Sequence, residues 1–171
     1  WKQPDMPFYF VQLANFLKKE EIQPDSEWAA LREAQSKALY LNNTGMAVTT
    51  DLGEANNIHP KNKQEVGLRL SQLALKPLFK SYRIEGNTIR IGFDNPGKGF
   101  MKPDTIKGFI IAGADHIFYP ATVTIQKKEI IVESPDVPHP VAVRYNWADN
   151  PDGNLYGLSG LPTAPFRTDN W

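Results

Sequence analysis

Cysteine is absent from this chain of 171 residues, and its absence excludes several kinds of chemistry. Without thiols there can be no disulfide, no thiolate metal site and no cysteine nucleophile. The missing cysteines do not by themselves decide the compartment, because many proteins of both oxidising and reducing compartments lack them.

Net charge and long apolar runs are absent as well. The 19 Lys and Arg residues balance 19 Asp and Glu residues, so we expect no nucleic-acid partner. No run approaches the roughly 20 apolar residues that cross a bilayer, and we expect no membrane partner. The chain opens with Trp-Lys-Gln-Pro, which does not resemble a signal peptide and which we interpret as the interior of a longer protein.

Helical and strand patterns alternate over residues 1–79. A composition of 41% hydrophobic and 22% charged residues is ordinary for a globular domain. The expected elements, in order, are a strand over 7–13, a helix capped by Asp25 or Ser26 and reaching about Tyr40, a strand over 46–50, and a helix from about Lys61 to about Phe79, which Pro77 ends or kinks. This alternation predicts an α/β fold with a parallel sheet. Two strands are too few for such a sheet, so the segment is predicted to be the C-terminal part of a larger α/β domain.

Residues 80–171 have a different character. A Gly-Asn turn separates two alternating runs within 82–93, and Lys127-Lys128 separates two more, as at a hairpin tip. The further strand candidates are 108–112, 122–126, 129–133 and 142–145. Short strands at this spacing predict a second, all-β domain resembling a β-sandwich, followed by a loop-rich tail.

One histidine stands where chemistry is expected. His59 lies in the loop between the second strand and the second helix. In open α/β sheets the loops at the carboxyl ends of strands carry ligand chemistry, and an imidazole there can act as a general base. From this pattern alone, a structural or merely exposed histidine is the commoner alternative.

Several motifs in order make a family resemblance specific. The run Asp51-Leu52-Gly53-Glu54, followed by Ile58-His59-Pro60-Lys61, closely resembles the last catalytic block of sialate O-acetylesterases, a branch of the SGNH hydrolases. Matching runs also occur at 7–13, 28–35, 141–151, 160–162 and 165–169. The resemblance implies that 1–79 is the C-terminal portion of a three-layer α/β/α SGNH domain.

The activity implied by this resemblance is hydrolysis of O-acetyl esters of sialic acid or related sugars. His59 would activate a serine, and the family needs neither a metal nor a cofactor. The family's serine lies in a Gly-Asp/Gln-Ser block that does not occur here, so we expect it in a missing N-terminal part of the catalytic domain or in a companion chain. The family also suggests a periplasmic or secreted location in bacteria.

The acid of a catalytic triad is less defined. Many SGNH enzymes carry an Asp three residues before the histidine, where this chain has Asn56. An amide can hold an imidazole tautomer but cannot stabilise an imidazolium with a full charge. We predict Asp51 as the catalytic acid; the alternatives are Glu54 or a dyad without an acid.

Substrate-binding residues are predicted from the same comparison. Arg32 and Gln35 share a helix face that the family places near its active site, Gln12 ends the first strand, and Asn57 lies beside His59. For Arg32 and Gln35 the alternative is a surface role, and for Gln12 a hydrogen bond within the sheet. Arg144, Trp147 and Asp149 are predicted to pack the two parts together, rather than to form a sugar platform.

Two other functions remain open at this point. One is a non-catalytic carbohydrate-binding or domain-docking β-sandwich module. The other is an acetylxylan esterase of the same family, because these motifs describe the hydrolytic machinery and not the sugar.

Overall fold

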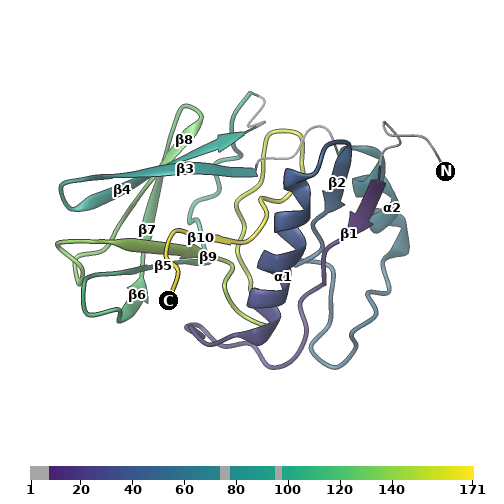
Figure 1. Ribbon diagram of the computed structural model, residues 1–171, viewed down its shortest axis with the longest axis horizontal. Helices are drawn as coiled ribbons and strands as arrows, with labels where there is room; N and C mark the ends of the chain where they lie inside the picture. Colours follow the sequence, from purple (N-terminus) through teal and green to yellow (C-terminus); the bar gives the residue numbers. More distant parts are fainter. Residues whose placement is uncertain (1–7, 74–77, 95–97) are drawn as a thin grey trace.

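The computed structural model describes residues 8–73, 78–94 and 98–171. Two parts lie side by side along the long axis of the molecule (Figure 1): a helix-and-strand part, here called the α/β part, and a part made of two β-sheets. Among the described residues, no helix is both long and apolar enough to cross a membrane.

The α/β part is built around two parallel strands. Strands β1 (Phe8–Val11) and β2 (Thr44–Ala47) pair in parallel register, and helix α1 (Glu27–Lys37), the 3₁₀ turn η1 (Ala38–Tyr40) and helix α2 (Lys63–Ser71) complete it. In Figure 1 the strands lie between α1 and α2. Ser26 caps α1 as expected, since its Oγ accepts a hydrogen bond from the Ala29 N–H at 3.0 Å.

Two predicted boundaries of this part are wrong. The second strand begins at Thr44 and ends at Ala47, instead of covering 46–50. Helix α2 ends at Ser71, and Phe79 belongs to a strand, because its ring stacks on Phe166 of the β part at 4.7 Å between ring centroids. The expected role of Pro77 lies outside the described residues.

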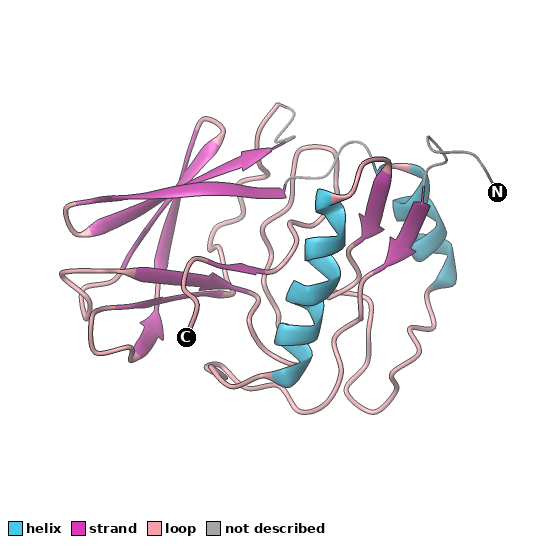
Figure 2. Cartoon of the chain, viewed as in Figure 1, coloured by secondary structure: helices cyan, strands magenta, loops and turns pink. Residues whose placement is uncertain are grey.

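The β part contains two four-stranded antiparallel sheets. The first has the order β3 (Leu78–Glu85), β4 (Thr88–Asp94), β8 (Glu129–Glu133) and β7 (Thr122–Gln126). The second has the order β10 (Phe166–Arg167), β9 (Ala142–Tyr145), β5 (Phe109–Ala112) and β6 (Phe118–Pro120). Figure 2 shows the two sheets stacked in the β part. The hairpin at Lys127-Lys128 is confirmed, whereas β6 and β10 were not predicted.

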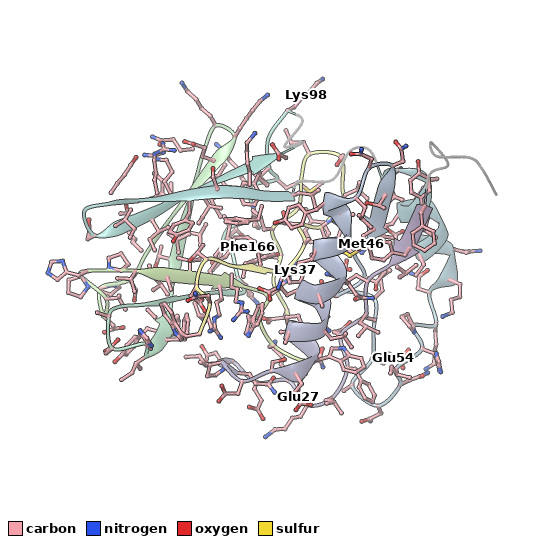
Figure 3. The ribbon with its side chains drawn as sticks, viewed as in Figure 1. Glu27, Lys37, Met46, Glu54, Lys98 and Phe166 are labelled. Carbon is pink, nitrogen blue, oxygen red and sulfur yellow. The ribbon has the colours of Figure 1, made fainter. Side chains whose placement is uncertain are left out.

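A single apolar core fills the space between these sheets. Alternate residues of each strand point into it, including Ile89 and Ile91 of β4 and Ile130 and Val132 of β8, all fully buried. Phe166, labelled in Figure 3, brings an aromatic ring from β10 to within 5.8 Å of the Tyr145 ring. The long-range contact of this ring explains why a two-residue strand forms there.

Strand β9 and the C-terminal tail, here residues 146–171, contact the α/β part. Arg144 Nη1 and Trp147 Nε1 both donate to the Pro24 carbonyl, at 2.8 and 3.2 Å. Asp149 accepts from Ser26 Oγ at 2.5 Å, and Ala164 packs on Met46 and Val48 of the other part. The tail therefore joins the two parts, and the packing roles predicted for Arg144, Trp147 and Asp149 agree with these contacts.

Candidate active site

The loop of residues 48–62 connects β2 to α2 and carries His59. Strands β1 and β2 point in the same direction, and the chain that follows β2 runs on to the lower edge of the molecule in Figure 1. Glu54, a member of this loop, is labelled at that edge in Figure 3. The segments that follow β1 and β2 stay side by side, because the Thr49 hydroxyl donates to the Gln12 carbonyl at 2.7 Å. This position is the one at which open α/β sheets place ligand chemistry.

His59 is exposed on this loop. Its backbone N–H donates to Asn57 Oδ1 at 3.0 Å, which closes a local turn. Among the described residues, no hydrogen bond is made by the imidazole ring itself. The ring is thus open to solvent and accessible to a group from outside this chain.

Asp51 lies in the first turn of the loop and is held by two partners. Arg69 of α2 donates to both carboxylate oxygens, with Nη2 to Oδ2 at 2.7 Å, and the Tyr156 hydroxyl donates to Oδ2 at 2.6 Å. Burial alone would raise the pKa of Asp51, but these hydrogen bonds outweigh burial and leave the pKa below its ordinary value. Burial and donation to Asp51 together raise the pKa of Tyr156. Asp51 is therefore an ionised carboxylate with strong partners at neutral pH.

The other acidic candidate also has a partner. Glu54 forms an ion pair with Lys61 at 2.9 Å, across the loop that carries His59. The Asn57 N–H donates to the Glu54 carbonyl at 3.1 Å, so the segment between them forms a tight turn. Among the described residues, neither Glu54 nor Asp51 is hydrogen-bonded to the His59 ring, and their roles as triad acids stay predictions.

Arg32 is the most deeply buried charged residue of this region, at 0% exposure. Its guanidinium donates to four backbone carbonyls: Leu13 and Ala14 after β1, and Ala148 and Asp149 of the tail, at 2.6 to 2.9 Å. Burial lowers the pKa of Arg32 to about 10, against the opposing effect of Asp149, so the group stays charged at neutral pH. The side chain is buried rather than on the surface, and its contact with substrate stays a prediction.

Gln35 and Gln12 lie at the same contact between α1 and β1. Gln35 Oε1 accepts from the Leu13 N–H at 2.9 Å, and Gln12 Nε2 donates to the Arg32 carbonyl at 3.1 Å and to Ser36 Oγ at 3.2 Å. The structure therefore brings Arg32, Gln35 and Gln12 together, while Asp51, Asn57 and His59 form a second group on the loop. Substrate binding by the two glutamines and Asn57 stays a prediction.

Asn15 joins the segment after β1 to the His59 loop and to Asn150, and it was missed from sequence. Its Oδ1 accepts from the Gly53 N–H at 2.6 Å, and its Nδ2 donates to Asn150 Oδ1 at 2.5 Å. A Cβ added at Gly53 would lie 2.1 Å from the Asn15 carbonyl oxygen, so only glycine permits this approach. Arg69 and Tyr156 were also missed, and only the i, i+4 spacing of Glu65 and Arg69 offered a signal for one of them.

The serines around this site are used structurally. Ser26 caps α1, the Ser36 hydroxyl donates to the Arg32 carbonyl at 3.0 Å, and the Ser71 hydroxyl donates to the Leu68 carbonyl at 2.7 Å. None of these three lies in a glycine-rich turn after a strand, which is the setting of an activated serine.

Two further features lie apart from the loop. A cavity of about 630 Å³ is lined by residues 19–21, the segment 105–110 and the start of the tail, without His59. No cluster of three or more possible metal ligands occurs within residues 8–73, 78–94 and 98–171.

Comparison with known proteins finds a solved structure that is similar to this chain. No family model matches the chain, and no curated protein does. The chain is similar to a solved crystal structure of a novel carbohydrate acetylesterase from Xanthomonas citri, with 44% sequence identity and a TM-score of 0.89. The alignment covers 98% of this chain but only 42% of that one, so this chain spans less than half of the length of its relative. Both parts described above therefore occur together in that enzyme.

Proposed function

We propose that this chain forms part of a carbohydrate acetylesterase, a carboxylic ester hydrolase in which His59 is the general base. The observation that carries the proposal is the 44% identity to a carbohydrate acetylesterase over 98% of this chain, with His59 exposed on the loop that follows β2. The nucleophilic serine is supplied by polypeptide outside this chain.

The α/β part offers a place for that missing polypeptide. Strand β1 pairs with β2 alone among the described strands, so its other edge is free to accept a further strand. Phe8 and Tyr9 of β1 are 64% and 55% exposed, although aromatic residues in a strand of this kind are usually buried. We infer that the serine-bearing part extends the sheet at β1, which brings the carboxyl end of its strand to the same edge as the His59 loop.

The reaction then follows from ordinary acyl-transfer chemistry. The His59 imidazole removes the serine hydroxyl proton as the serine oxygen attacks the acetyl carbonyl. The resulting imidazolium then gives this proton to the sugar oxygen, and the sugar leaves as an alcohol. Water, deprotonated by the same imidazole, attacks the acetyl-serine and releases acetate. The exposed ring and the turn closed by Asn57 support this role, because the base must be accessible and held in place.

The finer proposal concerns the sugar. The motifs around Asp51 and His59 resemble sialate O-acetylesterases, and on that basis we propose acetylated sialic acid or a related sugar as substrate, in the periplasm or outside the cell. Acetylated xylan is the second candidate within the same reaction class. The pocket that distinguishes the two is expected to lie largely in the missing part.

Replacement of His59 by Ala in the complete protein tests the proposal. Acetate release from O-acetylated sialosides and from acetylated xylo-oligosaccharides is expected to fall by about a thousand-fold or more, as for loss of a catalytic base. The matched control is His139→Ala, an exposed histidine on a loop of the β part, which is expected to keep full activity. A His59→Ala protein with unchanged turnover would refute the proposal, and so would serine-type turnover by this chain alone.

A further inference from the structure

Arg69 connects the start of the His59 loop to the rest of the α/β part. The side chain is only 6% exposed, and its guanidinium donates to the Val48 carbonyl at 2.9 Å, to Glu65 Oε1 at 2.9 Å and to both oxygens of Asp51. The buried Arg69 side chain, which belongs to α2, thus binds Val48, the residue after β2, and Asp51 in the first turn of the loop. Planar, two-pronged Arg–carboxylate contacts set orientation as well as distance.

Tyr156 adds a partner from a distant part of the chain. It belongs to the C-terminal tail, 105 residues from Asp51 in sequence, and its hydroxyl donates to Asp51 Oδ2 at 2.6 Å. The phenol is half-buried, which strengthens this hydrogen bond relative to one in water. The start of the His59 loop is therefore bonded both to α2 and to the tail.

The middle and the end of the loop are held independently. The Leu17 N–H donates to the Ala55 carbonyl at 3.0 Å, and Asn15 binds both backbone groups of Gly53. At the end of the loop Asn62 caps α2, because its Oδ1 accepts from the Glu65 N–H at 3.1 Å. The direction in which the chain leaves β2 is set by the Asp51 cluster together with the Thr49 hydroxyl, which donates to the Gln12 carbonyl at 2.7 Å.

The carboxylate oxygens of Asp51 accept hydrogen bonds from Arg69 and Tyr156. Each carboxylate oxygen accepts from Arg69, and one accepts from Tyr156 as well, whereas no hydrogen bond to the His59 ring occurs in the part of the chain that the structure describes. We propose that Asp51 is a positioning residue, which together with Arg69 and Tyr156 clamps the start of the loop and so holds His59 in place for the reaction. This inference rests on the proposed function and assigns Asp51 and Tyr156 a role in it.

The effect on catalysis follows from geometry. Displacement of a catalytic group by about 1 Å can lower the rate about a hundred-fold, and a loosened loop spends only part of its time in the productive position. Loss of the clamp should lower kcat in proportion to that fraction and leave the sugar-binding contacts, and hence KM, largely intact. Loss of a triad carboxylate, which orients the histidine ring and stabilises its imidazolium, would instead cost about 10⁴-fold in kcat.

The first test measures kinetics in the complete protein. Tyr156→Phe removes a single hydroxyl and is expected to lower kcat about three- to ten-fold, and Asp51→Asn about ten- to a hundred-fold, both with KM and the midpoint of the acidic limb of the pH profile unchanged. The double variant should be no slower than Asp51→Asn, since Tyr156 acts through Asp51. Tyr82→Phe, on β3 and 43% exposed, is the matched control with unchanged kcat.

The second test needs no enzymatic activity. In this chain, amide deuterium exchange at Leu52, whose N–H donates to the Thr49 carbonyl in the first turn of the loop, and at His59 is expected to be several-fold faster in Tyr156→Phe than in the unmodified chain or in Tyr82→Phe. Unchanged exchange in this loop overturns the inference, as does a 10⁴-fold loss of kcat in Asp51→Asn with full activity in Tyr156→Phe. If the complete protein lacks esterase activity, the proposed function fails, while faster exchange would still establish the clamp.

Discussion

The two parts of this protein are stabilised in opposite ways. The β part encloses a continuous apolar core, in which residues from both sheets are fully buried. Among the described residues, the apolar cluster of the α/β part has three buried members, Met46, Val48 and Ala164, with Phe10, Leu39 and Leu78 partly buried against them. Ala164 comes from the tail. The interior of the α/β part instead holds charged and polar side chains, above all Arg32 and Arg69, that bind backbone carbonyls.

This difference shows what each part can do alone. A core of interleaved apolar side chains is complete in itself, because it needs no particular partner for each atom. Buried guanidinium groups stabilise only while each N–H has its acceptor, and here those acceptors are the ends of strands and the returning tail. The α/β part therefore depends on the tail for its integrity, and its free β1 edge is consistent with a sheet that continues in another polypeptide segment.

The largest expected effect comes from Arg32. Arg32→Leu removes a donor from each of four backbone carbonyls, of which Ala14 keeps the Trp28 Nε1 donor and Asp149 keeps the Phe16 N–H. We expect the free energy of unfolding of the α/β part to fall by about 4 kcal/mol or more. Amide exchange should increase throughout β1 and α1, while β4 and β8 stay protected. Arg83→Leu, an exposed arginine on β3, is the control; equal effects of the two substitutions would contradict the comparison.

A smaller loss is expected from the apolar core of the β part. Ile91 is fully buried on β4, and Ile91→Ala should lower the free energy of unfolding by about 2 to 4 kcal/mol through lost burial and the resulting cavity. Ile84→Ala, at a position on β3 that is 50% exposed, should cost less than about 1 kcal/mol. Urea denaturation monitored by circular dichroism compares the two, and a larger loss at Ile84 would show that the core lies elsewhere.

The smallest effect depends on pH and tests the polar interior. Because the pKa of Asp51 is lowered in the folded protein, its contribution is complete above the unfolded pKa of about 3.9 and is lost as pH falls through the folded value. We expect the unmodified chain to exceed Asp51→Asn in stability by about 1 to 2 kcal/mol at pH 7, and the difference to vanish toward pH 2.

Urea midpoints measured from pH 7 to pH 2 check this expectation. Asp104→Asn, at an exposed position of the β part, is the control and should show no comparable dependence on pH. A stability difference for Asp51→Asn that stays constant over this range would show that the carboxylate charge contributes nothing to the loop.

Local sequence patterns were sufficient for much of the β part. The strands at 122–126, 129–133 and 142–145 form with the predicted bounds, because alternation of apolar and polar residues follows directly from the two faces of a strand. Elements that depend on distant contacts were missed. Phe79 was assigned to a helix and β10 was not expected, although the Phe79 ring of β3 stacks on the Phe166 ring of β10. No local pattern encodes a partner that lies far away in sequence.

The candidate site divides in the same manner. By itself, the sequence determined that His59 lies on the loop between a strand and a helix, and that Asp25 or Ser26 caps α1, since both follow from local spacing and side-chain chemistry; the structure chose Ser26. Only the tertiary structure decided that Arg32 is buried and that Asp51 is bound by Arg69 and Tyr156. The physical reason is that a buried charge such as Arg32 must find its partners wherever the fold supplies them. The fold likewise brings Tyr156 to Asp51 from 105 residues away.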